Sequence, residues 1–135
     1  MESSRDKLAD RMRLAARIVG FGMVGFGATM LIGGAVIEYL RGGMAAGSAP
    51  IPLELIIAIA IGAVALAALI LSWRRERLAG VMLVSCAAAM GAHVIIFIER
   101  NATYVWLVLG LPYLVSGVLF LNAWRISRGE PSEAL

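Results

Sequence analysis

Four long apolar runs, separated by short polar stretches, set the pattern of this chain. They cover residues 14–37, 53–72, 78–98 and 104–123. A helix of about 20 apolar residues crosses a hydrocarbon core of ~30 Å, so each run is long enough to span a bilayer. The stretch RGGMAAGSAPIP after the first run is typical of a loop, whereas WRRER and ERNAT are short enough to force antiparallel neighbours.

The pattern therefore predicts an all-α membrane protein whose four transmembrane helices form two antiparallel hairpins. We expect one transmembrane domain, residues 14–125, between a cytoplasmic basic tail, residues 1–13, and a cytoplasmic C-terminal tail, residues 126–135. The first apolar run is too long for a signal peptide, and we expect it to be a retained helix.

Composition supports the membrane interpretation. The 135 residues are 61% hydrophobic with a mean hydropathy of +0.87, whereas soluble domains are about 45–50% apolar. A chain of this length cannot hide so much apolar surface in a core of its own. The lipid bilayer is therefore its first expected partner.

The distribution of Lys and Arg predicts the orientation. Ten of the 12 flank the side that carries both termini and the second connection, and only Arg41 and Arg100 flank the other side. By the positive-inside rule, both termini lie in the cytoplasm of a multi-pass plasma or inner membrane protein. Because these charges punctuate apolar runs instead of forming a soluble patch, the net charge of +3 does not indicate nucleic acid. The interfacial aromatics agree with this orientation: Trp73 and Trp124 on the inner side, and Tyr39, Tyr104 and Trp106 on the outer side.

The chain offers little for catalysis or cofactor binding. Its one lysine lies in the N-terminal tail, and it has one histidine and one cysteine. We expect no enzyme activity, no cofactor and no metal site, because no convergent cluster of polar side chains is evident. The carboxylates Glu38, Glu54 and Glu99, with two arginines close by, predict a solvated ion-pair rim at the outer side in preference to a cation site.

His93 is the one ionisable ring within an apolar run. Ser85 and Ala89 precede it at helical spacing, with Cys86 and Met90 alongside, which predicts that these residues share an inward-facing side of the third helix. Val84, Ala87, Val94 and Ile98 are then expected to point elsewhere.

The fourth run contains GLPYLVSG. Pro112 cannot donate a backbone hydrogen bond, so a kink is expected there. Tyr113, Ser116 and Gly117 share an approximate face, and Tyr113 lies at a depth similar to His93. We expect a structural His–Tyr or His–carbonyl hydrogen bond between the third and fourth helices. A proton-responsive or ligand-contacting role for His93 is the alternative.

The first run carries two lines of small residues. Gly20, Gly27, Gly34 and Glu38 fall on one side of a helix, and Gly22, Gly25, Thr29 and Gly33 fall on the opposite side. Membrane helices pack through small residues. One line is expected to serve the bundle and the other a second copy or another membrane subunit, unless glycine is present only because it is common in membrane helices.

Two segments, SWRRERLAG and GLPYLVSGVLFL, resemble those of an uncharacterised family of small four-helix prokaryotic integral membrane proteins, a domain of unknown function. The resemblance covers roughly residues 55–125. It implies the topology and a prokaryotic membrane, and it assigns no activity and no site.

Together these features predict a non-enzymatic accessory or assembly subunit, or a homo-oligomeric structural membrane protein. The alternative is a small dimeric transporter or channel with His93 and Tyr113 beside a polar pathway.

Overall fold

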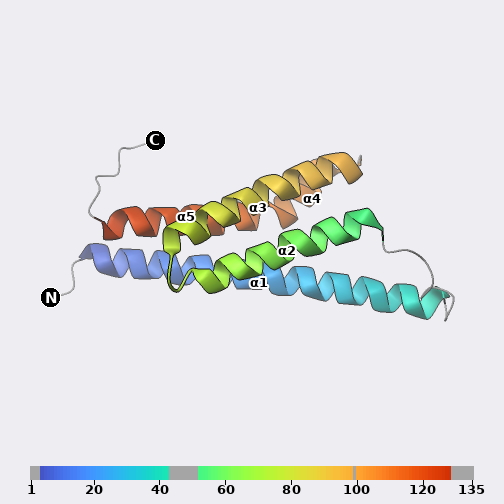
Figure 1. Ribbon diagram of the computed structural model, residues 1–135, viewed down its shortest axis with the longest axis horizontal. Helices are drawn as coiled ribbons and strands as arrows, with labels where there is room; N and C mark the ends of the chain where they lie inside the picture. Colours follow the sequence, from blue (N-terminus) through green and yellow to red (C-terminus); the bar gives the residue numbers. More distant parts are fainter. Residues whose placement is uncertain (1–3, 43–51, 99, 129–135) are drawn as a thin grey trace.

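The computed structural model describes residues 4–42, 52–98 and 100–128, without the side chains of residues 35, 38, 39 and 42. These residues form α1 (Ser4–Gly42), α2 (Leu53–Leu71), α3 (Glu76–Phe97), α4 (Ala102–Leu109) and α5 (Leu111–Ser127), with no strand among them. The helices lie side by side along one long axis (Figure 1). Their direction alternates, so the start of α1, the connection between α2 and α3 and the end of α5 share one end of the molecule.

The all-α prediction is confirmed, and helix bounds match the apolar runs closely except for the first. α1 begins at Ser4, so most of the predicted basic tail is helical. Its 39 residues make a helix of about 58 Å at ~1.5 Å per residue. The stretch Ser4–Gly34, α2 and α3 are each long and apolar enough to cross a membrane, and α4 with α5 qualifies as a bent fourth span.

The predicted kink in the fourth run is confirmed. α4 and α5 meet at Gly110 with a bend of 41°. Pro112 lies in the first turn of α5, where a missing N–H costs little. It also interrupts the series of backbone hydrogen bonds that would continue from α4. The bend turns α4 toward α3.

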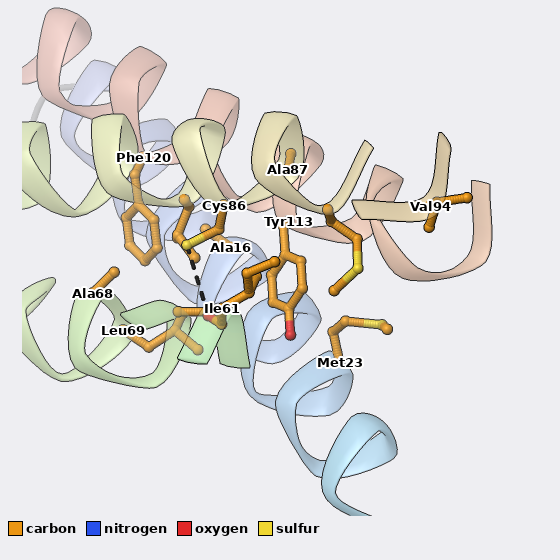
Figure 2. Close-up of a cluster of buried hydrophobic side chains, with 13 residues drawn as sticks. Ala16, Met23, Ile61, Ala68, Leu69, Cys86, Ala87, Val94, Tyr113 and Phe120 are labelled. Carbon is orange, nitrogen blue, oxygen red and sulfur yellow. Dashed lines mark hydrogen bonds between the residues drawn. The ribbon is translucent and has the colours of Figure 1, made fainter. Parts of the chain in front are cut away.

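The helices pack unequally. α1 lies mainly against α5, α5 also lies against α3, and α3 lies against α2, whereas contact between α1 and α2 is sparse. α1 and α2, the two helices of the first predicted hairpin, thus follow each other in the sequence but make little contact. One core cluster forms where α1, α2, α3 and α5 meet, and Figure 2 labels these members of it: Ala16, Met23, Ile61, Ala68, Leu69, Cys86, Ala87, Val94, Tyr113 and Phe120.

Two glycines, one on α3 and one on α5, allow the backbones of these helices to approach each other closely where they cross. A Cβ atom on Gly80 would lie 3.0 Å from the carbonyl oxygen of Gly117, and one on Gly117 would lie 2.9 Å from the carbonyl oxygen of Gly80. Nearby, the buried Ser116 Oγ donates a 2.7 Å hydrogen bond to the carbonyl oxygen of Ala16 on α1. These contacts hold α5 between α1 and α3.

Candidate functional site

His93 and Tyr113 do not form the predicted hydrogen-bonded pair. The His93 ring packs against Phe97 one turn along the same helix, with 5.0 Å between ring centroids. Its Nδ1 is buried and has no hydrogen-bond partner in the described part of the chain. Among the described residues no hydrogen bond joins His93 to Tyr113 or to a carbonyl, and His93 is a half-buried aromatic side chain of α3.

The prediction for the inward face of α3 is wrong in part: Cys86 and Met90 are buried as expected, but the polar line beside them is not. Ser85 and Ala89 are exposed, while Ala87 and Val94 are buried. Ser85 Oγ donates to the carbonyl oxygen of Val81 in its own helix, so its hydroxyl is satisfied without turning inward. α3 packs against both α2 and α5. Its buried face is therefore the one whose small and apolar side chains contact these two helices, and not the one that carries the polar line.

Tyr113 belongs to the core. Its side chain is 3% exposed, and Ser116 and Gly117 are buried on the same side of α5, as predicted. Figure 2 shows the hydroxyl pointing past Ile61 toward the side of Met23. It lines an apolar cavity of about 330 Å³ between α1 and α2, together with Met23, Gly27, Gly62, Leu66 and Met90.

The glycines of α1 differ in how closely they are packed. A Cβ on Gly20 would collide with Leu69, and it would lie 3.0 Å from Ser116 Oγ. A Cβ on any of the later α1 glycines would meet nothing within 4 Å: Gly22, Gly25, Gly27, Gly33 and Gly34. On the first predicted line, Gly20 thus packs tightly in the bundle, and Gly27 lines the cavity between α1 and α2. Thr29, on the second line, donates to the carbonyl oxygen of Gly25 in its own helix.

The predicted outer rim falls largely outside the described residues. The side chain of Glu38 and the whole of Glu99 lie there. Glu54 is exposed in the first turn of α2, where a carboxylate suits the positive end of the helix dipole.

The opposite end carries the charge contacts that the described residues show. Arg13 on α1 pairs with Glu76 at the start of α3, with 2.6 Å between Nε and Oε1, and its Nη1 lies 2.6 Å from Asp10 Oδ1. The guanidinium of Arg17 lies over the Trp73 ring, 5.4 Å from its centroid.

Trp124 on α5 is contacted by two arginines. The guanidinium carbons of Arg77 and Arg128 lie 5.1 and 4.8 Å from its ring centroid. The sequence predicts Trp73 and Trp124 as interfacial residues at this end, but helical spacing does not predict which arginines of other helices contact them.

Trp106 has a role that the sequence did not reveal. Its indole Nε1 donates a 3.2 Å hydrogen bond to the carbonyl oxygen of Ala87 and thereby ties α4 to α3. A Cβ on Gly91 would lie 3.0 Å from the same nitrogen, and Gly110 leaves room on its other side. The expected outer interfacial residue is thus half-buried between two glycines.

Comparison with known proteins gives a family and no activity. No curated protein matches the chain, and no solved structure matches it either. A family model described as a domain of unknown function, DUF7670, matches residues 5–132. The predicted resemblance to an uncharacterised family is confirmed in that form, over more of the sequence than the two segments that suggested it. The chain therefore belongs to the DUF7670 family.

Proposed function

We propose that this chain is a four-span integral membrane protein that does no catalytic chemistry and works by self-association through the outer half of α1. Three helices of sufficient length and hydropathy support the membrane assignment, and α4 with α5 supplies the fourth span. The protein would serve as a homo-oligomeric structural subunit or as an assembly subunit of a larger membrane complex.

The distribution of charge supports an orientation with both termini in the cytoplasm of a plasma or inner membrane. The end that holds the start of α1, the α2–α3 connection and the end of α5 carries ten of the 12 Lys and Arg. Positive charge next to membrane spans favours the cytoplasmic side. The resemblance noted above adds a prokaryotic setting to this proposal.

The observation that carries the proposal is the unoccupied glycine surface of α1. Gly20 is closely packed inside the bundle and Gly27 lines the cavity between α1 and α2, whereas a Cβ on any of the other later glycines would meet nothing within 4 Å. A glycine that faces lipid lowers helix propensity by about 1 kcal/mol and makes no contact in return. Its usual role in a membrane helix is to let another backbone come close, so a second helix is expected there.

A second copy of the same chain fits this surface best. Gly25, Thr29 and Gly33 follow at intervals of four residues, so they form one small-residue line along the helix. Lines of this kind pack against identical lines, and a two-fold axis brings the same surface from both copies together. The large apolar side chains beside the line, such as Phe26 and Ile32, are exposed and available to pack around such a crossing.

Transport through His93 and Tyr113 receives less support. The two side chains do not bond to each other, and the cavity beside Tyr113 is lined almost wholly by apolar side chains. We therefore favour assembly.

The test is the oligomeric state of the full chain released in mild detergent and measured by native mass spectrometry. We expect a homodimer or higher homo-oligomer that Gly25→Leu and Gly33→Leu convert toward monomer. Ala67→Leu is the matched control, because Ala67 is exposed on α2 and does not line the cavity.

If Gly25→Leu and Gly33→Leu both assembled like the unchanged chain, the glycine surface would have no part in assembly. If the unchanged chain bound a discrete partner of different mass and the same two variants lost it, the glycine surface would bind another membrane subunit and not a second copy.

A further inference from the structure

A second cavity lies at the opposite end of the bundle from the outer half of α1. Its volume is about 720 Å³, and its walls are the α2–α3 connection, the start of α3 and the end of α5. Five arginines and one glutamate line it, together with two tryptophans: Arg13, Arg74, Arg75, Arg77, Arg128, Glu76, Trp73 and Trp124.

The one acidic side chain in this wall is already neutralised. Glu76 pairs with Arg13 at 2.6 Å. Within the described chain no carboxylate pairs with Arg74, Arg75, Arg77 or Arg128. Of these, Arg77 and Arg128 rest on the Trp124 ring, a contact that holds a guanidinium by its face and leaves the N–H groups at its edge free to donate. As far as the structure describes the chain, the cavity thus holds positive charge that no carboxylate pairs with, and its walls focus that charge.

The start of α3 adds backbone donors to the same wall. Arg75 occupies its N-cap position and makes no side-chain capping bond. The carbonyl oxygen of Arg75 accepts from Ala79, but the amides of the first helical turn have no acceptor inside the helix. These amides and the positive end of the helix dipole favour an anion beside residues 76–78.

We propose that this cavity binds a phosphate group that carries an organic substituent. Arginine forks and helix amides together match the several acceptor oxygens of a phosphate. The volume equals that of about two dozen waters at ~30 Å³ each, so it accommodates more than a bare phosphate ion. An anionic phospholipid headgroup and a soluble phosphate ester share this chemistry. The proposal does not depend on self-association through α1.

The test uses the full chain in detergent, titrated with phosphatidate, with phosphatidylcholine and with glycerol phosphate, and followed by native mass spectrometry. We expect phosphatidate to bind at least about tenfold more tightly than phosphatidylcholine. The double variant Arg77→Gln/Arg128→Gln should weaken phosphatidate binding by at least about tenfold, because it removes two charge-assisted donors.

The matched control is Arg11→Gln/Arg125→Gln, which loses the same formal charge at the same end from residues that do not line the cavity. It should change the affinity by less than about threefold. Equal losses in the two double variants, or equal binding of the two lipids, would refute the site. Should the first double variant unfold because Trp124 loses its stacking partners, Arg74→Gln/Arg75→Gln tests the same prediction with two exposed side chains.

Competition identifies the source of the phosphate. Displacement of phosphatidate by glycerol phosphate at comparable concentration would support the site with a soluble ester as its ligand. Retention of phosphatidate under the same conditions would support it with a lipid headgroup. The dimer-to-monomer ratio in the same spectra reports on α1 separately, so failure of one proposal leaves the other measurable.

Discussion

At the scale of single residues, the crossing of α3 and α5 depends on the absence of two side chains. Gly117→Ala would place a methyl group 2.9 Å from the Gly80 carbonyl oxygen and 2.8 Å from Val84 Cγ2. A backbone carbonyl cannot rotate away as a side chain can, so the two helices must separate. We expect a loss of about 1–3 kcal/mol in the free energy of unfolding, which thermal unfolding in detergent would show as a lower Tm.

Gly62→Ala is the matched control, since a Cβ there meets nothing within 4 Å. It should leave the stability unchanged or raise it by up to about 1 kcal/mol through better helix propensity. Equal destabilisation by both substitutions would show that the α3–α5 crossing is not the tight point of the fold.

Sequence patterns succeeded with some residues and failed with others for a physical reason. The shared face of Tyr113, Ser116 and Gly117 was predicted correctly, because α5 buries the side on which its small and polar residues coincide. The face of α3 was predicted only in part, because Ser85 satisfies its hydroxyl within its own helix and its polarity then gives no direction. Helical spacing shows which residues share a face, but the neighbouring helices decide which face is buried.

At the scale of elements, the tie between α4 and α3 depends on Trp106. Trp106→Phe removes the hydrogen bond to the Ala87 carbonyl oxygen and shrinks the ring that fills the space beside Gly91. Because α4 has eight residues and none of them is fully buried, it is held by this indole and by partly buried apolar side chains such as Val105 and Leu109. We expect faster amide hydrogen exchange across residues 102–109, with α5 exchanging as before.

The contrary outcome is a uniform rise in exchange across α4 and α5, which would mean that the two helices unfold as one unit. Trp73→Phe is the control for loss of an indole, because Trp73 is exposed at the other end of the bundle. It should leave exchange in α4 unchanged.

Helix bounds were largely predictable, and the arrangement of the helices was not. Arginines and prolines mark the ends of α2 and α3, so their limits could be read within two residues. The first helix was expected to begin near residue 14, but helical structure continues back to Ser4, and Ala9 within this extension is fully buried. Which helices lie beside α1 depends on packing between helices, and the sequence of one helix alone does not show that packing. The basic cavity was missed for that reason, since its arginines and tryptophans come from three separate segments.

At the scale of the whole molecule, the segregation of charge predicts which end faces the cytoplasm. A chain without thiols is obtained by Cys86→Ala, and single cysteines are then added by Thr103→Cys or Arg125→Cys, both at exposed positions at opposite ends. In intact cells, a maleimide that cannot cross the plasma or inner membrane should label the Thr103→Cys chain and leave the Arg125→Cys chain unlabelled until lysis. The positive charges would hold their end on the inner side, where the membrane potential and the anionic leaflet both favour them. Labelling of the Arg125→Cys chain alone before lysis would invert the topology, and it would move the basic cavity to the outer surface, where any phosphate ligand must then be found.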